Sequence, residues 1–600
     1  MQNYTNLKVI SYLLFNVHHT KDLLKHEYFS AFDKDAIEIL LKAVKDFSDK
    51  ELFPYIKEMD EKPSYFKDGK IIIHPQFKTI FKKAVEMDLV NATFSFDEGG
   101  LQLPISVFHS LYYIMEAANN HVSGYLGLTL GAANLIISFG NQELKNTYAT
   151  KMLKMEWGGT MCLTEPQAGS SLSDIKTQAI KVENKDYYQI KGQKIFISAG
   201  DHQFADNFVH LVLARVKGAP KGTKGVSLFV VPNKRPTNKG LEDNKVRVLG
   251  EFEKLGQRGY CTSHLSFGDE PDCRGWLVGK ENKGLSYMFL LMNEARIATG
   301  RMGAGIASAA YYAALQYAKE RPQGRLLNNK GKKDDNKEQT LIINHPDIKR
   351  MLLKQRAIVE GSLSLIIQTA HYLDQLKICD ENDKEKYKLL LELLTPIVKT
   401  FPAEQGKIAV DNGLQILGGY GFTTDFILQQ YYRDIRIISI YEGTTGIQSL
   451  DLLGRKVTIK NGKALHYLME EMAITLKEAT NFNELSSYAK QLKKQLELVK
   501  TIMAKLIPKA LAGDFENFLA DANIFMDFLS TLVIGWQWLK IAATACKTKT
   551  ENEKNTGFED NLIHTMAYFY IYEMPKLEGL AKILLNNQSL TVKANANTFD

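Results

Sequence analysis

The sequence predicts a mainly α-helical protein with a β domain inserted between two helical regions. Apolar residues recur at helical spacing through roughly the first 150 residues. Short alternating or β-branched segments occupy residues 158–268, and helical periodicity returns at Ser286. A chain of 600 residues is too long for one compact core, so two to four packing units are expected.

The individual elements follow from these two periods. Predicted helices of the first region cover residues 33–57, 107–118 and 125–139. Predicted strands cover residues 187–198, 210–216, 225–232 and 261–267. Later helices are predicted over residues 288–319, 345–376 and 385–417, followed by a helical block over residues 455–585. Residues 328–340, NNKGKKDDNKEQT, have almost no apolar content and predict an exposed loop.

Composition excludes several classes of protein. The chain is 45% hydrophobic and 24% charged, as in ordinary globular proteins, and its net charge of +7 is mild for this length. Five scattered cysteines, without metal-ligand spacing, favour a reducing compartment and argue against a structural metal. The N-terminus lacks a small-residue cleavage site, so a signal peptide is not expected. The apolar run at 528–539 is shorter than the ~20 residues of a membrane span.

One carboxylate stands out in residues 440–448, IYEGTTGIQ. Glu442 lies between a tyrosine and a glycine, where Gly443 and Gly446 predict a sharp turn before another helix. A desolvated glutamate at such a turn can have a raised pKa suited to removing a weakly acidic proton. Taken alone, a surface-loop glutamate or a helix N-cap acid is the commoner explanation. Glu442 alone therefore does not identify a catalytic base, and other motifs of the chain are needed to support that role.

Two segments of the β domain have the composition of a cofactor-binding edge. In MCLTEPQAGSS, residues 161–171, a Thr–Glu–Pro turn and small residues supply donors that suit a flavin pyrimidine edge or a phosphate. In KIFISAG, residues 194–200, Phe196 could cover a planar ring while Ser198 hydrogen-bonds to it. A plain turn explains most such matches when they occur alone. The presence of both segments favours a flavin site.

Three further segments are compatible with ligand binding but have simpler explanations. Gly300, Gly303 and Gly305 lie inside a predicted helix with no preceding strand, which favours close helix packing over a nucleotide loop. QILGGYGF, residues 415–422, is typical of a helix terminus, and a helix starting just beyond it could offer N–H groups to a diphosphate. Asn293 and Arg296 lie one turn apart in NEARIATGR, where a solvated helix face is the default.

Taken together, these motifs resemble the acyl-CoA dehydrogenase family of flavoproteins. The match follows the family's order through TEPQAGS, KIFIS, KLGQR, NEAR, ERPQG, QILGGYG, RD and YEGTTGIQ. The family fold is an N-terminal helical domain, a central β-barrel or sandwich and a four-helix bundle, in agreement with the order of periodicities. The length and the C-terminal addition resemble the 600-residue group that includes 3-methylmercaptopropionyl-CoA dehydrogenases.

The resemblance implies four domains. They are an N-terminal helical domain at 1–157, a β domain at 158–275, a four-helix bundle with the catalytic loop at 276–460, and an extra C-terminal helical domain at 461–600. Five aromatic residues of the last domain are expected to form its core: Trp536, Trp538, Tyr568, Phe569 and Tyr570. We expect this domain to cover a surface that shorter relatives use to pair dimers into tetramers, which leaves a homodimer.

The resemblance also implies the site residues. Glu442 would be the catalytic base beside the flavin of FAD. Residues implied to contact the isoalloxazine ring or its neighbouring loop are Met161, Leu163, Thr164, Gly169, Ser170, Phe196 and Ser198. Residues implied to serve the FAD diphosphate and adenosine side, across a subunit interface, are Arg321, Gln415 and Gly419, with Thr444 acting from the catalytic loop. Residues implied to bind the acyl and pantetheine parts of the substrate are Ser170, Asn293, Arg296 and Tyr441.

Three positions depart from the family pattern. Asn293 stands where many relatives have aspartate, which weakens the implied pantetheine contact. The segment RPQGR replaces the usual R-x-x-F-G and changes the surroundings of Arg321. Gly446 stands where glutamine is common, which removes one candidate flavin contact.

The implied reaction is α,β-dehydrogenation of an acyl-CoA thioester to the trans-2-enoyl-CoA. Glu442 would remove the α-proton while hydride passes from the β-carbon to flavin N5, and an electron-transfer flavoprotein would accept the electrons. In the family, the glutamate's own backbone N–H and a flavin ribityl hydroxyl stabilise the enolate-like oxygen. An acyl-CoA oxidase on the same fold, which passes electrons to oxygen, is the nearest alternative.

Two alternatives belong to other functional classes. A DNA-associated alkylation-response flavoprotein shares the fold and a C-terminal extension, but such a role needs a basic surface. Residues 461–600 hold 15 lysines, no arginine and 16 acids, without a dense basic run. A non-catalytic scaffold is the other alternative, and the acid at 442 weighs against it. We expect a cytoplasmic enzyme of fatty-acid β-oxidation, with no nucleic-acid partner and no membrane insertion.

Overall fold

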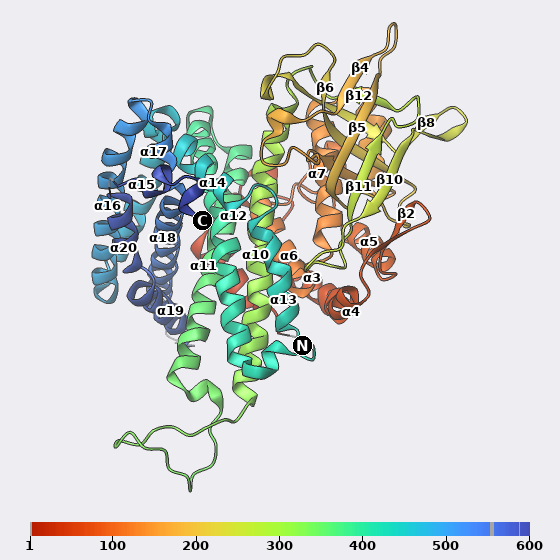
Figure 1. Ribbon diagram of the computed structural model, residues 1–600. Helices are drawn as coiled ribbons and strands as arrows, with labels where there is room; N and C mark the ends of the chain where they lie inside the picture. The colour runs from red at the N-terminus through yellow and green to blue at the C-terminus, as the bar shows by residue number, and fades with distance from the viewer. Residues whose placement is uncertain (1–2, 552–556, 587) are drawn as a thin grey trace. The chain divides into compact units, whose positions relative to one another are not determined.

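The structure is a computed structural model that describes residues 3–551, 557–586 and 588–600 (Figure 1). Contacts divide the chain into two compact units. We call Ala43–Leu103 with Ile114–Ala295 the β unit, because it contains the strands. We call Met1–Lys42, Pro104–Tyr113 and Arg296–Asp600 the helical unit.

The β unit is built around one sheet. Among the described residues this sheet has eight strands, ordered β10-β11-β5-β12-β7-β6-β3, with β4 paired to both β5 and β6. Its strands are β3 Trp157–Cys162, β4 Gln178–Lys181, β5 Tyr188–Ser198, β6 Asn207–Val216, β7 Val226–Pro232, β10 Val246–Glu251, β11 Thr262–Phe267 and β12 Arg274–Leu277. Two short hairpins are formed by β1 Tyr65–Lys67 with β2 Lys70–Ile72 and by β8 Lys234–Thr237 with β9 Gly240–Asp243. The four strands predicted from the sequence correspond to β5, β6, β7 and β11.

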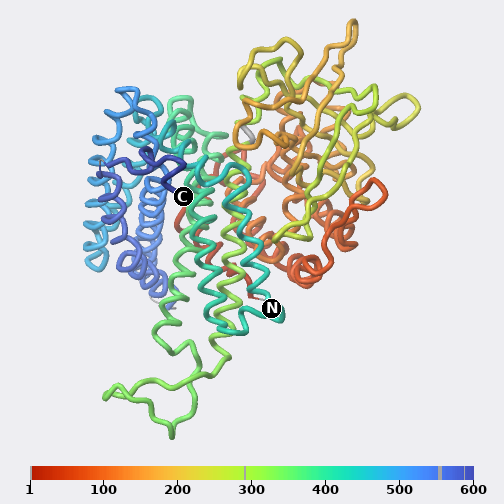
Figure 2. The backbone as a smooth tube through the Cα atoms, in the orientation of Figure 1, coloured from red at the N-terminus to blue at the C-terminus, as the bar shows by residue number. Residues whose placement is uncertain are grey.

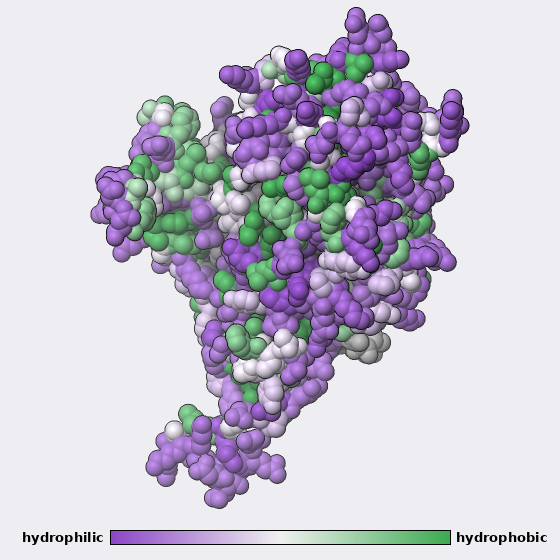
Figure 3. All heavy atoms as spheres, turned by 45° about the vertical axis from the view of Figure 1, so that its right-hand side comes forward, coloured by the Kyte–Doolittle hydropathy of each residue, from purple (hydrophilic) through white to green (hydrophobic). Residues whose placement is uncertain are grey.

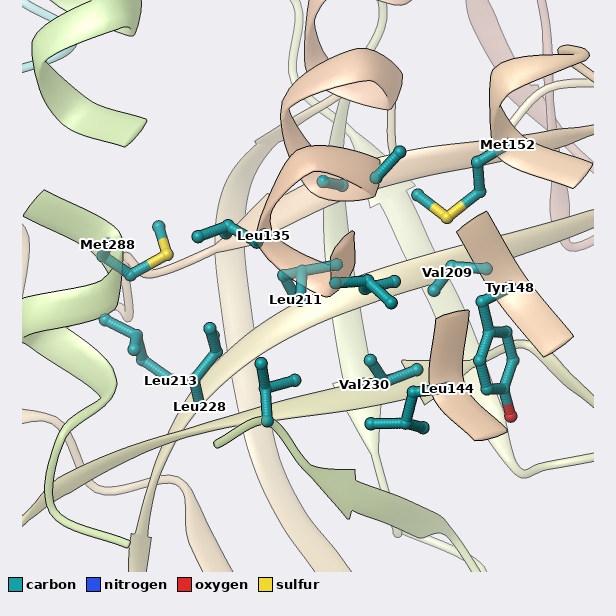
Figure 4. Close-up of a cluster of buried hydrophobic side chains, with 14 of the residues drawn as sticks. Leu135, Leu144, Tyr148, Met152, Val209, Leu211, Leu213, Leu228, Val230 and Met288 are labelled. Atoms are coloured by element: carbon teal, nitrogen blue, oxygen red, sulfur yellow. The ribbon is translucent and has the colours of Figure 1, made fainter. Parts of the chain in front are cut away.

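Strand β6 is buried on both faces, so its alternating side chains supply two different cores. Leu211 and Leu213 pack on the side of helix α7, Ser123–Phe139, in a cluster that includes Leu135 (Figure 4). Val212 packs on the opposite side, in a second cluster with Phe229. The parallel pairing of β3 with β6 places Met161 beside Leu211. The sheet thereby carries the end of β3, where the TEPQAGS segment starts, on a rigid support.

The helices before the sheet agree with the predicted first helical region. They are α1 Leu7–Tyr12, α2 Thr20–Leu23, α3 Lys34–Phe47, α4 Ile56–Glu61, α5 Phe77–Glu86, α6 Ile105–Ala118, α7, α8 Gln142–Leu144 and α9 Thr150–Leu153. The predicted helix over residues 33–57 is α3 followed by a π-helical turn at Ser48–Leu52 and a 3-10 turn at Phe53–Tyr55. Pro54 lies in that 3-10 turn, where its missing N–H does not interrupt a long helix.

Long helices form the first part of the helical unit. They are α10 Gly284–Glu320, of which residues from 296 onward belong to this unit, α11 Pro346–Ile378, α12 Glu381–Leu417 and α13 Leu428–Ile435. Helices α11 and α12 run side by side over most of their length (Figure 2). The segment between α10 and α11 includes residues 328–340, which are almost entirely exposed, as predicted, and it forms the hydrophilic projection at the bottom of Figure 3.

Close packing of α10 on α12 explains the glycines that resemble a nucleotide loop. A Cβ atom at Gly300 would lie 1.9 Å from the carbonyl oxygen of Val398 on α12. Pro402 lies one turn after Val398 in α12 and has no N–H, so the Val398 carbonyl lacks its usual helical hydrogen bond. The backbone of Gly300 packs closely against this carbonyl. A Cβ at Gly303 would lie 3.1 Å from the Pro402 carbonyl oxygen. The interpretation of these glycines as helix-packing residues is confirmed.

The C-terminal part of the helical unit buries an aromatic cluster that also packs on α11, where Trp538 Nε1 donates to the Ala357 carbonyl oxygen. Its helices are α14 Thr445–Asp451, α15 Ile459–Ala479, α16 Ser486–Leu511, α17 Phe515–Leu519, α18 Ala522–Glu551, α19 Phe558–Tyr572, α20 Lys576–Leu584 and α21 Leu590–Lys593. Trp536 and Trp538 of α18 are buried, as are Tyr568, Phe569 and Tyr570 of α19, which confirms the predicted core. Among the described residues, one stretch, Phe515–Glu551, is long and apolar enough to cross a membrane. Much of its most apolar window is buried in the protein, as in an ordinary core helix.

Candidate active site

Glu442 lies on the sharp turn that the sequence predicts. The chain leaves α13 through a 3-10 turn, Arg436–Ser439, and α14 begins at Thr445. Between them Glu442 has φ 53° and Gly443 has φ 84°. Positive φ is ordinary for glycine but strained for a residue with a Cβ, so the surrounding structure must hold Glu442 in place. Thr444 is the N-cap of α14, where its side chain accepts a hydrogen bond from the Ile447 N–H.

Two buried side chains hold the backbone of this turn. Gln448 donates from Nε2 to the Glu442 carbonyl oxygen at 2.9 Å. Lys399, on α12, donates from Nζ to the Gly443 carbonyl oxygen at 2.9 Å. Both side chains have no exposed surface. Consecutive carbonyls of the strained turn are thus fixed from two directions.

The Glu442 carboxylate has few polar neighbours. It is partly buried, and among the described residues no group donates a hydrogen bond to it. Burial raises its pKa, while the positive charges of Arg296 and Lys399 lower it. Burial also lowers the pKa of Lys399 to about 8, against the opposing effects of Glu442 and Glu404. A carboxylate with a raised pKa and no donor is suited to accept a proton.

Three of the predicted substrate-binding residues, Arg296, Tyr441 and Asn293, differ in their burial and in their polar partners. Arg296 is buried, and its Nη1 lies 2.8 Å from Oδ2 of Asp451 on α14. Much of its charge is therefore committed to an ion pair within the protein. Tyr441 donates a hydrogen bond to the sulfur of Met302 at 3.3 Å. Asn293 is partly buried on α10, in the portion of that helix assigned to the β unit.

In the β unit, the two segments predicted to bind flavin lie side by side. The loop after β3 carries Leu163 and Thr164, and the Thr164 carbonyl accepts a hydrogen bond from Ile195 N–H at 3.0 Å. The neighbouring Lys194 donates from Nζ to the Leu163 carbonyl oxygen, also at 3.0 Å. Glu165 and Ala168 close the TEPQAGS turn by exchanging backbone hydrogen bonds. Gly169 and Ser170 follow on the exposed side of that turn.

A buried ion pair ties these two segments together. The Glu165 carboxylate lies 2.8 Å from Lys194 Nζ, and both side chains are almost fully buried. Glu165 also accepts hydrogen bonds from the backbone N–H groups of Lys176 and Thr177 and from the Thr177 hydroxyl. Burial would raise the pKa of Glu165, but Lys194 and these donors lower it to about 2. The carboxylate is therefore ionised and fully partnered.

Phe196 has an unusual conformation for a strand residue. Its φ is 56°, and the residue is 56% exposed although it lies near the end of β5, with its ring centroid 4.5 Å from that of Phe252. Ser198, the last residue of that strand, is partly buried, as is Met161 near the end of β3. An exposed ring beside an open turn of small residues fits a planar cofactor ring. The strained φ is of the kind found at ligand-binding positions.

The segment QILGGYGF is a helix terminus, as predicted, but no α-helix starts directly beyond its glycines among the described residues. Helix α12 ends at Leu417 and a 3-10 turn, Gly418–Phe422, follows, while the next α-helix begins only at Leu428. Gln415 and Gly419 are exposed, and a Cβ at Gly419 would meet no atom within 4 Å. The Arg321 guanidinium, at the end of α10, lies 5.6 Å from the Tyr420 ring centroid. An exposed cation, an aromatic ring and an open glycine surface fit a nucleotide diphosphate and its base.

Comparison with known families decides the identity. Models of the acyl-CoA dehydrogenase N-terminal, middle and C-terminal domains match residues 34–156, 160–269 and 282–457. A fourth model, described as acetyl-CoA dehydrogenase C-terminal like, matches residues 468–594. The chain belongs to the acyl-CoA dehydrogenase family. It is therefore an FAD-dependent oxidoreductase enzyme, and the predicted fold class, cofactor and family are confirmed.

Similar proteins share nearly the whole length of this dehydrogenase. The 3-methylmercaptopropionyl-CoA dehydrogenase of Ruegeria pomeroyi is 34% identical over 90% of this chain and 91% of its own. The broad-specificity linear acyl-CoA dehydrogenase FadE5 of Mycobacterium tuberculosis is 31% identical over 97% of both. Two solved structures share the fold. Caenorhabditis elegans ACDH-11 in complex with C11-CoA has a TM-score of 0.73, 19% identity and coverage of 98% of this chain and 92% of its own. A Bacillus anthracis acyl-CoA dehydrogenase complexed with FAD has a TM-score of 0.70 and 22% identity, and the match covers 94% of this chain and 90% of its own.

Four residues that hold the loop after β3 and the Glu442 turn were not predicted from the sequence: Glu165, Lys194, Lys399 and Gln448. Glu165 and Lys194 stand inside the recognised TEPQAGS and KIFIS segments, but nothing local shows that they pair. Lys399 had a visible signal, because it is the one charged residue of the otherwise apolar or small run TPIVKTFPA. A lysine inside such a run must be buried with a partner or must extend its charge to solvent.

Proposed function

We propose that this dehydrogenase converts an acyl-CoA thioester to the trans-2-enoyl-CoA, with Glu442 as the base that removes the α-proton. The observation that carries the proposal is the Glu442 carboxylate itself. It is partly buried on a strained turn and accepts no hydrogen bond from a described residue, and burial raises its pKa. A group of this kind is costly to maintain for stability alone, which favours a role in proton transfer.

The backbone of the same turn supplies a second function. Among the described residues, no group accepts a hydrogen bond from the Glu442 N–H. We assign this N–H to the thioester carbonyl oxygen, where negative charge develops as the α-proton leaves. Lys399 and Gln448 would keep the donor and the base in a fixed relation, because they hold the two carbonyls that follow.

FAD, when bound, accepts the hydride from the β-carbon of the substrate. In the β unit, Met161, Leu163, Thr164, Gly169, Ser170, Phe196 and Ser198 would hold its isoalloxazine ring. In the helical unit, Arg321, Gln415, Gly419 and Thr444 would serve its diphosphate and adenosine side. Asn293, Arg296, Tyr441 and Ser170 would bind the acyl-CoA, Arg296 through whatever donors its ion pair with Asp451 leaves available.

We further propose a homodimer that works in cytoplasmic fatty-acid β-oxidation and passes its electrons to an electron-transfer flavoprotein. Exposed rings near the proposed adenosine surface, Tyr420 at 49% and Phe422 at 87%, support an interface there. The C-terminal block, residues 461–600, would then cover the surface that pairs dimers in shorter relatives. Light scattering of the FAD-loaded protein tests this, and a tetramer would contradict it.

The test of the base is Glu442→Gln. We expect this variant to retain FAD, because the substitution removes only the carboxylate charge. We expect turnover to fall by roughly 10²- to 10⁴-fold, which is the contribution that general-base catalysis typically makes. Dye reduction measures the rate, and the flavin absorbance measures cofactor content. Substantial turnover in this variant would remove Glu442 as the base.

The acyl group and the electron acceptor need separate assays. A panel containing 3-methylmercaptopropionyl-CoA, butyryl-CoA and C11-CoA, drawn from the names of related proteins, can be screened for bleaching of the flavin absorbance. Oxygen consumption measured beside dye reduction then separates a dehydrogenase from an oxidase. Fast turnover with oxygen alone would favour the oxidase alternative.

A further inference from the structure

Lys399 is a buried cation that forms no ion pair with a carboxylate among the residues that the structure describes. It has no exposed surface, and its Nζ donates to the Gly443 carbonyl oxygen at 2.9 Å. Within the described residues, no carboxylate oxygen lies within 4.0 Å of this nitrogen. Burying an ammonium group without a close partner costs several kcal/mol even after the protein relaxes. A neutral donor could hold the same carbonyl at less cost, so the charge itself needs an explanation.

Two cations act on Glu442, Arg296 more strongly than Lys399, and Lys399 is the one that also holds a carbonyl of the turn. Arg296 of α10 pairs with Asp451 of α14 at 2.8 Å, and Asp451 also pairs with Arg455 at 2.7 Å. On α12, Glu404 pairs with Lys407 at 2.6 Å. The positive charge of Lys399 therefore acts on Glu442 in addition to that of Arg296.

We propose that Lys399 is a positioning residue for the base: it holds the Gly443 carbonyl so that the Glu442 carboxylate keeps its orientation. This inference rests on the proposed role of Glu442. Glu442 belongs to a turn with positive φ, and both carbonyls that follow its Cα are held by side chains from within the helical unit. Loss of one holder would allow the turn to relax toward a less strained conformation.

The charge of Lys399 also makes the effect depend on pH in a defined direction. Lys399⁺ lowers the pKa of Glu442, so removing the charge raises that pKa and reduces the ionised fraction of the base at low pH. The pKa of Lys399 is about 8, so the charge is present on the acidic side of that value and is lost above it. A neutral amine still donates to the Gly443 carbonyl, so the tether persists where the charge does not.

The experiment measures proton removal separately from flavin reduction. The full-length, FAD-loaded protein is mixed in deuterium oxide with an acyl-CoA analogue that has sulfur in place of the β-carbon. This analogue has no β-hydrogen to transfer, so Glu442 can remove an α-proton and return a deuteron without net oxidation. Mass spectrometry of the analogue gives the exchange rate from about pH 5 to about pH 9.

The decisive variant is Lys399→Met. We expect its exchange rate near pH 6 to fall by roughly 10- to 100-fold, because a displacement of about 1 Å in a reacting group costs on the order of 10²-fold. We also expect the acidic limb of its pH profile to move to higher pH. Lys399→Arg keeps a donor and a charge that does not titrate near pH 8, and it should restore the position of the acidic limb.

Lys540→Met is the matched control. Lys540 is also a lysine whose pKa burial lowers to about 8, and its Nζ donates a hydrogen bond to Gln368 Oε1 at 2.8 Å. Its removal should lower thermal stability but leave the pH profile of exchange unchanged. A Lys399→Met profile that coincides with wild type, or a Lys540→Met profile that shifts in the same way, would overturn the proposal.

Glu442→Gln in the same assay separates the role of Glu442 as the base from the role of Lys399 as its positioning residue. If this variant still exchanges the α-proton at the wild-type rate, the proposed base is wrong. If it has lost exchange while Lys399→Met behaves as wild type, the base is supported and the role of Lys399 is wrong. Flavin absorbance and thermal unfolding, measured on every variant, identify any protein that has lost FAD or its fold.

Discussion

Lys194 in the β unit and Lys399 in the helical unit use the same contact in different electrostatic settings. Each is fully buried and each donates to a backbone carbonyl of a predicted functional loop, Leu163 at 3.0 Å and Gly443 at 2.9 Å. Lys194 also has a carboxylate, Glu165, at 2.8 Å. Lys399 has no carboxylate oxygen within 4.0 Å among the described residues.

Because only Lys194 of the two has a carboxylate at short range among the described residues, we interpret Lys194 as a structural cation and Lys399 as a cation that acts on Glu442. The charge of Lys194 is largely cancelled at short range, so its field beyond the Glu165 contact is weak. Its contribution is to join the loop after β3 to strand β5. Lys399 serves as a comparable tether, but its charge remains available to Glu442. A buried ion pair and a lone buried cation are thus expected to respond differently to substitution and to pH.

The largest effect is expected for Glu165→Gln. This change leaves the Lys194 ammonium buried without its carboxylate, which costs about 3–5 kcal/mol in the free energy of unfolding. Urea unfolding of the full chain measures the loss, and the flavin absorbance reports the integrity of the loop. Replacing both partners, as Glu165→Leu with Lys194→Met, should cost much less because no charge is stranded. Equal losses in the single and double variants would show that the Lys194 charge does not need Glu165 for stability.

The same pair predicts an acid dependence. The pKa of Glu165 is about 2 in the folded protein against an ordinary value of 4.5. The stability that this shift contributes is fully present above pH 4.5 and is lost as the pH falls toward 2, because the unfolded chain then binds the proton first. Glu165→Gln should lack this part of the acid profile. An unchanged profile would argue that other carboxylates dominate it.

An effect of intermediate size is expected for Lys399→Met at alkaline pH. Burial lowers the pKa of Lys399 from 10.5 to about 8, so between these values the unfolded chain binds a proton that the folded protein does not. Wild-type stability should therefore rise with pH across this window, relative to the variant, by on the order of 3 kcal/mol. Urea midpoints of both proteins, measured on either side of the window, give the difference. A parallel pH dependence in the two proteins would show that Lys399 is not buried as a titrating amine.

The parts of the molecule that follow from local pattern were predictable. Helical and strand periods located β5, β6, α10 and α12, and the missing strand before Gly300 indicated helix packing, which its approach to Val398 confirms. The loop after β3 and the strand with Phe196 were expected to cooperate, and backbone hydrogen bonds join them. Each of these predictions depends on residues within one element or on a recognisable motif.

The supporting residues depend on contacts between distant segments. Lys399 and Gly443 are far apart in the sequence, and no period or spacing shows that a lysine on one helix reaches a particular carbonyl on a later turn. The positive φ of Phe196 and Glu442 was equally hidden, because residues with a Cβ avoid that region and adopt it only when tertiary contacts impose it. The sequence does show that Lys399 stands in an apolar run, but it does not show that this lysine contacts the Gly443 carbonyl.

The weakest loss is expected for Gln448→Leu, which removes a tether of the turn without removing a charge. Gln448 holds the Glu442 carbonyl as Lys399 holds the next one, but its amide carries no charge. Loss of one neutral buried hydrogen bond should cost about 1 kcal/mol and lower α-proton exchange by roughly 10-fold. The acidic limb of the pH profile should stay where it is in wild type, because no charge beside Glu442 has changed. A shift equal to that of Lys399→Met would mean that the geometry of the turn sets the protonation of Glu442, and that the lysine charge does not.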